Sequence, residues 1–462
     1  MIPISTRYRV YDLEYILRQS DAKALILEPK FLGKIDSIGM LHQLCPELTN
    51  SEPGELVSNE FPLLKTIVCV DGRFEGCFSI NEILDKGGGV SESDVYVELK
   101  PNDTIHIIYT SGTTGFPKGI VTPNTCNIAL CTIEAELISL KQGSRYLSVL
   151  PFFGNIGLGA ISMCLLTGAT LVMTNRFLPI DTLNIIEKER ITNAMLVPTT
   201  LIDLLAHPDF NKSDLSSLKH VNSAGAVVPS TVIREFKRRT GVDIINCYGL
   251  AESSGLSTWV PEGDTVEHME KTIGLPLPHC ELAIRDVKTD EVLPTDVEGE
   301  ICTKEVFPGS QHMKGYYKKP ELTAQTIRNG WLHSGDLGKM DKDGYVYITG
   351  RVKEMYTVGG FNVSPPEIED FLLKHPKIEA VSVVGVPDNR LGEIGAAFVR
   401  LKKDTKATER EIIEYCEKYI ADIKIPRYVF FVQEFPLNPQ GKVQKFKQRE
   451  WAMQKLNLKE TK

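Results

Sequence analysis

Apolar runs of strand length alternate with amphipathic helical stretches over about the first 350 residues of this chain. The strand-like runs lie at 24–27, 66–70, 145–150, 194–197 and 220–223, and helical periodicity lies between them, as at 10–19 and 231–239. Such alternation is typical of layered α/β folds in which most of the sheet is parallel. The sequence therefore predicts a large, multi-layer α/β domain over residues 1–350.

The pattern changes after Gly350. Ser364-Pro365-Pro366-Glu367 has the composition of a helix start, and Thr408-Glu409-Arg410-Glu411 is a capping box that predicts a second helix through Ile420. Strands are expected around these helices, at 380–386, 396–401 and 428–432. The sequence therefore predicts a small α+β domain over residues 351–462.

Length and charge exclude several classes of protein. A chain of 462 residues is too long for one ordinary core, in agreement with two domains. Its 52 basic and 60 acidic residues give a net charge of −8, which argues against general affinity for nucleic acids or anionic membranes. Any positive charge that serves a site must be concentrated locally. The sequence leaves the oligomeric state open, with a homo-oligomer among the options.

Cysteine usage and hydropathy indicate the compartment. The ten cysteines are scattered, with no Cys-x-x-Cys pair and no zinc-like spacing, so free thiols in a reducing cytoplasm are the simplest interpretation. The most apolar stretch, 156–173, is expected to divide at Gly168 into a buried helix and a strand. We therefore expect a cytoplasmic protein without a transmembrane segment.

A loop suited to polyphosphate follows the apolar run 105–108. Residues 109–119 read Tyr-Thr-Ser-Gly-Thr-Thr-Gly-Phe-Pro-Lys-Gly and supply backbone N–H groups, hydroxyls and one ammonium group. The loop is not a Walker A motif, because that motif needs Gly-Lys-Ser/Thr five residues after its first glycine, and Phe116-Pro117-Lys118 follow here instead. A Gly/Thr-rich surface turn is the alternative interpretation.

Two later motifs carry an acidic residue. Tyr248-Gly249-Leu250-Ala251-Glu252-Ser253 follows a strand-like run, where an aromatic ring can stack on a base and the carboxylate can bind a metal ion. Asp336 lies in a glycine-flanked turn, Trp331–Gly338, where its carboxylate can accept hydrogen bonds from ribose hydroxyls. Taken alone, a tight turn with a solvated Glu252 and an Asx-type turn at Asp336 remain open.

Two further motifs lie beyond residue 350. Gly359-Gly360 would let the backbone approach a ligand closely. Lys442, on the loop Pro436–Lys442, can neutralise negative charge in a transition state. A surface turn at the glycines and a solvated basic tail around Lys442 are the alternatives.

In their order along the chain these motifs resemble those of the adenylate-forming (ANL) superfamily, in the acyl-CoA synthetase or fatty-acid–CoA ligase branch. The resemblance implies a large adenylation domain and a small mobile C-terminal domain. Lys442, Glu252 and Thr113 take catalytic roles in it, and Glu252 meets Mg²⁺ through ATP. The implied ATP-binding residues are Thr110, Ser111, Gly112, Thr113, Thr114, Gly115, Lys118, Gly225, Ala226, Tyr248, Gly249, Glu252, Ser253, Asp336, Arg351 and Lys442.

The same resemblance places the remaining parts of the site. The small domain would rotate about Lys353 and present Gly359 and Gly360 to a CoA tunnel. The acyl pocket would be lined by Phe153, Gly154, Ala224 and Gly225. Because these residues are small or apolar, we expect a medium- or long-chain fatty acid or another bulky apolar acid.

The implied reaction is that of an AMP-forming acid–thiol ligase with ATP, Mg²⁺ and CoA. A carboxylic acid attacks ATP to give acyl-AMP and pyrophosphate, and the acyl group then passes to CoA. An acyl-AMP ligase that loads a carrier protein and a non-catalytic nucleotide-binding homologue are the alternatives, and luciferase-type oxidation is a more distant one. Residues 2–9 resemble a segment that full-length relatives reach only after a substantial N-terminal portion, so a shortened N-terminus is expected.

Overall fold

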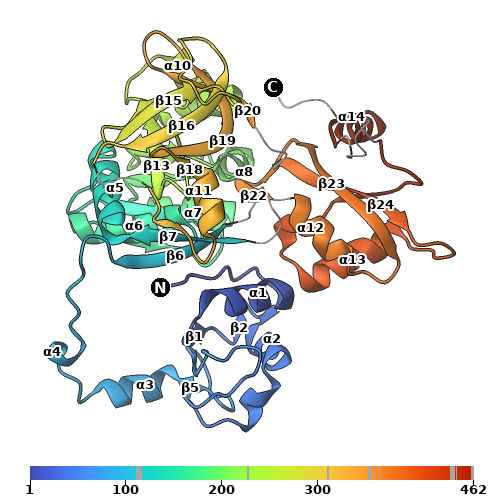
Figure 1. Cartoon of the computed structure of the whole chain (residues 1–462). Helices are drawn as coiled ribbons and strands as arrows, with labels where there is room; N and C mark the ends of the chain where they lie inside the picture. The colour runs from blue at the N-terminus through green and yellow to red at the C-terminus, as the bar shows by residue number, and fades with distance from the viewer. Residues whose placement is uncertain are drawn as a thin grey trace. The chain divides into compact units, whose positions relative to one another are not determined.

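The computed structural model describes residues 1–110, 117–225, 228–307, 309, 312–351, 356–363, 365–436, 443 and 445–458 (Figure 1). Two compact units make up the chain. Unit 1 contains Met1, Pro101–Thr405 and Pro426–Lys462, and unit 2 contains Ile2–Lys100 and Lys406–Ile425.

A seven-stranded sheet forms the centre of unit 1, in the order β14-β13-β12-β11-β10-β8-β9. Strands β9, β8, β10, β11 and β12 are parallel neighbours, as predicted, while β13 and β14 run antiparallel at one edge. The bounds are β8 Arg145–Ser148, β9 Thr170–Met173, β10 Asn193–Met195, β11 His220–Ser223, β12 Ile244–Leu250, β13 Gly255–Trp259 and β14 Leu275–Pro276.

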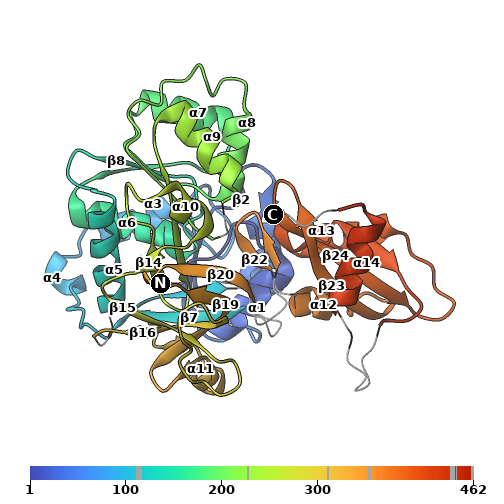
Figure 2. The same ribbon diagram turned by 90° about the horizontal axis from the view of Figure 1, so that it is seen from above.

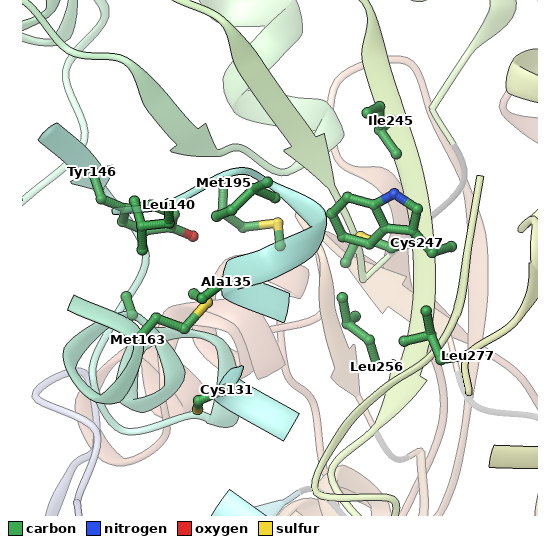
Figure 3. Close-up of a cluster of buried hydrophobic side chains, with 14 of the residues drawn as sticks. Cys131, Ala135, Leu140, Tyr146, Met163, Met195, Ile245, Cys247, Leu256 and Leu277 are labelled. Atoms are coloured by element: carbon green, nitrogen blue, oxygen red, sulfur yellow. The ribbon is translucent and has the colours of Figure 1, made fainter. Parts of the chain in front are cut away.

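Helices pack on both faces of this sheet because successive strand residues point to opposite sides. Tyr146 and Ile245 belong to one buried cluster, and their neighbours Leu147 and Ile244 belong to another. Helices α5 (Asn124–Leu137) and α6 (Asn155–Thr167) contribute to the first cluster. Figure 3 shows their side chains Cys131, Ala135 and Met163 on one side of this cluster, and Ile245, Cys247 and Leu277 on the other. Helices α7 (Pro179–Lys188), α8 (Pro198–Ala206) and α9 (Ser230–Thr240), which lie together in Figure 2, supply the second.

The division of the apolar stretch 156–173 is confirmed. Helix α6 ends at Thr167, Gly168 adopts a left-handed φ of 69°, and β9 begins at Thr170. Among the described residues, no helix has both the length and the apolarity that crossing a bilayer requires. All ten cysteines are free and buried.

Residues 275–351 form antiparallel strands, so the expectation of mainly parallel sheet is wrong for this segment. Strands β15 (Cys280–Arg285), β16 (Gly299–Glu305), β19 (Trp331–Met340), β18 (Ile327–Arg328) and β20 (Val346–Arg351) make one antiparallel sheet. Short turns join β18 to β19 and β19 to β20, and antiparallel neighbours need no crossover helix. Helices α10 (Val266–Lys271) and α11 (Pro320–Thr326) lie in the connections before β14 and β18.

A second antiparallel sheet of unit 1 holds the ends of the predicted phosphate loop. It has the order β17-β7-β6, from Gly315–Tyr316, Lys118–Pro123 and Thr104–Thr110. Thr110 is the last residue of β6 and pairs with Lys118, the first residue of β7. The predicted strand before the loop is therefore confirmed, and the loop joins the two strands of a hairpin.

The remaining sheet of unit 1 has the order β22-β21-β24-β23, with β25 beside β24. Its strands are β21 Tyr356–Val358, β22 Phe361–Val363, β23 Ile378–Asp388, β24 Gly392–Leu401 and β25 Tyr428–Phe431, and its helices are α12 Pro365–Leu372 and α14 Lys445–Lys455. The expected strands and the Ser364-Pro365 helix start agree with these bounds to within a few residues. Trp451 of α14 packs against Phe398 and Phe430 of the sheet, with ring centroids 5.5 and 5.1 Å apart.

Unit 2 contains the other elements. These are α1 Val10–Ser20, β1 Ala24–Leu27, β2 Lys30–Phe31, β3 Ile35–Asp36, α2 Ser37–Leu44, the 3₁₀ helix η1 Pro46–Asn50, β4 Thr66–Cys69, β5 Phe78–Ser79, α3 Ile80–Gly87, α4 Glu92–Val95, α13 Glu409–Tyr419 and η2 Asp422–Lys424. Thr408 caps α13 by accepting a hydrogen bond from the Glu411 N–H at 3.2 Å. Lys424 Nζ lies 2.8 Å from Asp12 Oδ1 in a buried ion pair, which no sequence motif predicted.

A partly buried carboxylate on α5 makes stability depend on pH. Burial raises the pKa of Glu134 to about 7, although the Leu256 N–H donates to this carboxylate at 3.3 Å and acts in the opposite direction. The folded protein thus retains a proton that the unfolded chain releases between about pH 4.5 and 7, so stability falls as the pH rises through that window. Glu134→Gln removes the charge and keeps an acceptor for Leu256.

We expect Glu134→Gln to stabilise the protein by about 2 kcal/mol at pH 8.5 and by little at pH 5. Thermal unfolding of both proteins at the two pH values checks this. Glu136→Gln, on an exposed face of the same helix, is the control and is expected to change neither melting temperature. An equal change in melting temperature for Glu134→Gln at both pH values would contradict the titration of Glu134 in this range.

Candidate functional site

Lys118 lies in a buried position at the start of β7. Only 7% of the residue is exposed, and its ammonium group lies 4.7 Å from the ring centroid of Tyr316. Strand β17 holds that ring in place, because Tyr316 pairs with Ile120 and the Tyr317 N–H donates to Gly119 O at 2.7 Å. The hairpin thus fixes the lysine of the predicted phosphate loop.

Glu252 reaches the same tyrosine from the other side. The Tyr316 hydroxyl donates to Glu252 Oε1 at 2.8 Å, across 64 residues of sequence. The structure therefore brings two predicted site residues to one side chain. Lys118, predicted to bind phosphate, lies at the ring of Tyr316, and Glu252, predicted to meet Mg²⁺, lies at its hydroxyl. Sequence reasoning missed Tyr316, since a tyrosine in a short strand has no distinguishing spacing.

The predicted adenine and ribose residues also meet. The Tyr248 hydroxyl donates to Asp336 Oδ2 at 2.8 Å, and both residues are buried. Strand β12 continues through Tyr248 to Leu250, so the motif that was expected to follow a strand begins within it. The register of the strand pair shifts between Tyr248 and Gly249. A side chain at position 249 would collide with Gly255 O, because a Cβ there lies 2.0 Å from that oxygen.

Asp336 lies within strand β19, so its expected placement in a turn is wrong. Gly335 has a φ of 77°, and the neighbouring Ser334 Oγ accepts from the Asp336 N–H at 3.0 Å. The strand continues because Asp336 pairs with Arg351 of β20. This pairing places the backbones of two residues predicted to bind ATP side by side. The side chain of Arg351 lies outside the described part of the chain.

Glu300 of β16 supports this segment and was also missed from sequence. Its Oε1 accepts from the Gly335 N–H at 2.8 Å, and its Oε2 lies 2.9 Å from His333 Nδ1. Burial alone would raise the pKa of Glu300, but the hydrogen bonds from His333 and Gly335 outweigh burial and hold that pKa below its usual value. A charged carboxylate therefore anchors the backbone next to Asp336.

Cys302 lies beside this pair, with Sγ 3.3 Å from His333 Nδ1. Glu300, Cys302 and His333 are close enough to share a metal ion. The Arg328 guanidinium, however, contacts His333 Nδ1 and lies 3.7 Å from Glu300 Oε2. A fixed cation of the protein thus already compensates the charge of this group.

The predicted acyl and CoA segments lie next to one another within unit 1. Phe153 stacks on Phe361 with ring centroids 6.2 Å apart, and Gly154 precedes α6 as its N-cap residue. Gly225 and Gly360 both have a φ of 85°, and a Cβ on Gly225 would lie 3.2 Å from Gly360 O. Substitution of Gly225 would therefore bring a side chain against the Gly359-Gly360 segment.

Other predicted residues have different placements. Ala224 is buried, and Gly359 has a φ of 56°. The Ser253 hydroxyl is bonded within its own segment, where it accepts from the Leu250 N–H at 3.0 Å and donates to Gly255 O at 2.8 Å. It therefore holds the turn that carries Glu252. Ser111, Gly112, Thr113, Thr114, Gly115, Ala226, Lys353 and Lys442 lie outside the described residues.

Comparison with known proteins identifies the family. Residues 1–317 match the AMP-binding enzyme family, and residues 367–442 match the C-terminal domain of AMP-binding enzymes. The chain is 38% identical to a putative acyl-CoA synthetase, YngI, of Bacillus subtilis over 99% of this chain and 84% of that protein. It is 34% identical to the human medium-chain acyl-CoA ligase ACSF2, mitochondrial, over 99% of this chain and 76% of that protein.

Solved structures agree with this assignment. The amide bond synthetase McbA of Marinactinospora thermotolerans matches with a TM-score of 0.82 at 27% identity, over 97% of this chain and 84% of that one. A fatty acyl CoA synthetase of Mycobacterium tuberculosis matches with a TM-score of 0.65 at 26% identity, over 98% of this chain and 83% of that one. The fold is thus that of adenylate-forming enzymes, with a large N-terminal and a small C-terminal domain. This chain belongs to the AMP-binding enzyme family, in its acyl-CoA synthetase branch, and is an AMP-forming acid–thiol ligase.

Proposed function

We propose that this enzyme activates a medium-chain or longer apolar carboxylic acid with Mg²⁺–ATP and transfers the acyl group to CoA. The hydrogen bond of Tyr248 to Asp336 carries the nucleotide part of this proposal. It joins an aromatic ring that can stack on adenine to a carboxylate that can accept both ribose hydroxyls. These two groups come from strands 88 residues apart in sequence and meet at one place.

The first half-reaction needs charge neutralisation more than covalent chemistry from the protein. A substrate carboxylate attacks the α-phosphate of ATP, the bond to pyrophosphate breaks, and acyl-AMP forms. Lys118 would hold phosphate oxygens together with Thr110, Ser111, Thr113 and Thr114. Lys442 would neutralise the negative charge that develops on the carboxylate and the α-phosphate.

Glu252 fits a Mg²⁺ ion that arrives with ATP. Mg²⁺ is usually bound by one or two carboxylates together with substrate phosphates and water, and Glu252 offers one hard carboxylate near the phosphate lysine. When bound, the ion would supply additional positive charge to the phosphates. The contribution of Glu252 is to present its carboxylate in a fixed orientation, set by the bond from Tyr316.

The second half-reaction breaks the bond between acyl group and AMP and forms the thioester. The Gly359-Gly360 segment supports a thiol path beside it, because backbone without side chains can approach a narrow chain closely. Rotation of the small domain about Lys353 would withdraw Lys442 from the site and bring the Gly359-Gly360 segment to it.

Apolar side chains around the acyl segment support the choice of acid. Phe153 and Phe361 stack on one another, and Ala224 is buried next to Gly225. Burial of methylene groups against such walls contributes about 0.8 kcal/mol each, which favours a hydrocarbon chain over a charged tail. The relative named a medium-chain acyl-CoA ligase supports the same class.

Mass spectrometry of products tests the proposal. Purified protein receives ATP, Mg²⁺, CoA and an equimolar mixture of linear acids from acetate to palmitate, together with benzoate and succinate. AMP and acyl-CoA of the medium and long linear acids should accumulate together. Preference for acetate or succinate would contradict the proposed acid, and acyl-AMP without thioester would identify a carrier-protein loader. Absence of both products would favour the non-catalytic homologue.

A further inference from the structure

Tyr316 contacts both Lys118, which the proposed function assigns to the phosphates, and Glu252, which it assigns to Mg²⁺, yet no motif assigned a role to Tyr316. Its hydroxyl donates to Glu252 Oε1 at 2.8 Å, and its ring lies 4.7 Å from Lys118 Nζ. Tyr316 and Lys118 are 6% and 7% exposed, so both contacts are largely shielded from water. Shielding strengthens each contact, because water competes less for the charges.

The backbone around Tyr316 is built to fix the ring. Its N–H donates to Thr323 Oγ1 at 2.9 Å. On β7 the bonds lie on both sides of Ile120, because the Lys314 N–H donates to Val121 O at 2.8 Å and the Tyr317 N–H donates to Gly119 O at 2.7 Å. Gly315 has a φ of 144°, and a Cβ there would lie 2.8 Å from Thr323 Cγ2. Only glycine therefore lets β17 lie this close to α11.

We propose that Tyr316 is a positioning residue that orients Glu252 through its hydroxyl and Lys118 through its ring. It thereby couples the position of the carboxylate proposed to bind Mg²⁺ to that of the lysine proposed to bind phosphate. The inference rests on the proposed function of those two residues. A carboxylate held by a hydroxyl donor keeps one orientation. An ammonium group against an aromatic face is attracted to the ring.

Two substitutions separate the two contacts. Tyr316→Phe removes the hydroxyl and keeps the ring, whereas Tyr316→Leu removes both. Tyr345→Phe is the matched control, because the Tyr345 hydroxyl donates to Asp264 Oδ2 at 2.6 Å and makes a comparable bond to a carboxylate outside the site. Circular dichroism and thermal unfolding establish that each variant is folded.

Equilibrium binding of ATP, measured by calorimetry with Mg²⁺ and with EDTA, is the readout. Tyr316→Phe should weaken binding about 3- to 10-fold in Mg²⁺ and hardly at all in EDTA, because the lost hydrogen bond to a charged group acts on ATP only through the orientation of Glu252. Tyr316→Leu should in addition weaken binding in EDTA by about 2- to 5-fold, the range for one cation–π contact. Tyr345→Phe should change neither value.

Double-mutant cycles identify the partners. The effect of Tyr316→Phe should disappear in a Glu252→Gln background, and the further effect of Tyr316→Leu should disappear in a Lys118→Met background. Additive effects in both cycles would overturn the inference while leaving the proposed function intact. Failure of the unmodified protein to bind ATP more tightly with Mg²⁺ would overturn the assigned role of Glu252 instead.

Discussion

Replacing Lys442 by alanine is expected to slow formation of acyl-AMP by about 10²- to 10³-fold, the range for loss of a single electrostatic stabiliser in a transition state. Thioester formation from acyl-AMP supplied to the enzyme should change less than about 5-fold, because no charge needs neutralising by this lysine once pyrophosphate has left. The two half-reactions are measured separately, by pyrophosphate release and by consumption of synthetic acyl-AMP with CoA.

Lys447→Ala is the matched control for Lys442→Ala. Lys447 is an exposed lysine of α14, five positions along the same basic C-terminal segment. If the segment served only as a solvated basic tail, both substitutions would have small and similar effects. Equal damage of Lys442→Ala to both half-reactions would contradict a role confined to adenylation.

Asp336→Asn is expected to raise KM for ATP about 10- to 100-fold, since hydrogen bonds to a charged acceptor contribute about 1.5–3 kcal/mol each. The carboxamide offers one acceptor oxygen where the carboxylate offers two. Its NH₂ group cannot accept a hydrogen bond from a ribose hydroxyl or from the Tyr248 hydroxyl. Because the ribose contact exists in both ground and transition states, kcat should fall much less than KM rises.

Initial rates at varied ATP and saturating acid and CoA check this split. Asp264→Asn is the control, because Asp264 also accepts a bond from a tyrosine hydroxyl, that of Tyr345, away from the site. Its KM for ATP should stay unchanged. A loss of kcat in Asp336→Asn at unchanged KM would contradict the ribose assignment and indicate a role in chemistry.

Much of the fold could be predicted from local patterns. The boundary of α6 and β9 at Gly168, the strand 220–223 and the capped start of α13 at Thr408 agree with the sequence, because each depends on neighbouring residues. The antiparallel strands of 275–351 could not be assigned in the same way, since the direction of a strand depends on which partner it meets.

Within the candidate site, the residues that could be predicted from sequence are those that lie in a recognisable sequence motif. Lys118, Glu252 and Asp336 stand in glycine-rich or signature segments, and the structure places all three in the same unit with buried aromatic partners. Placement of Asp336 in a turn was wrong, because cross-strand bonds to β20 extend β19 through this position. Local glycines alone do not reveal such bonds.

The chemical groups available to this protein can be identified in its sequence: the lysines, carboxylates and glycines of an adenylate-forming ligase, and the order in which they occur. Which of these groups contact one another depends on the folded structure. Tyr316 and Glu300 have no motif of their own, and their importance arises from bonds to Glu252 and to the Gly335 N–H. Those bonds join residues 64 and 35 positions apart, so they exist only after the sheets have paired.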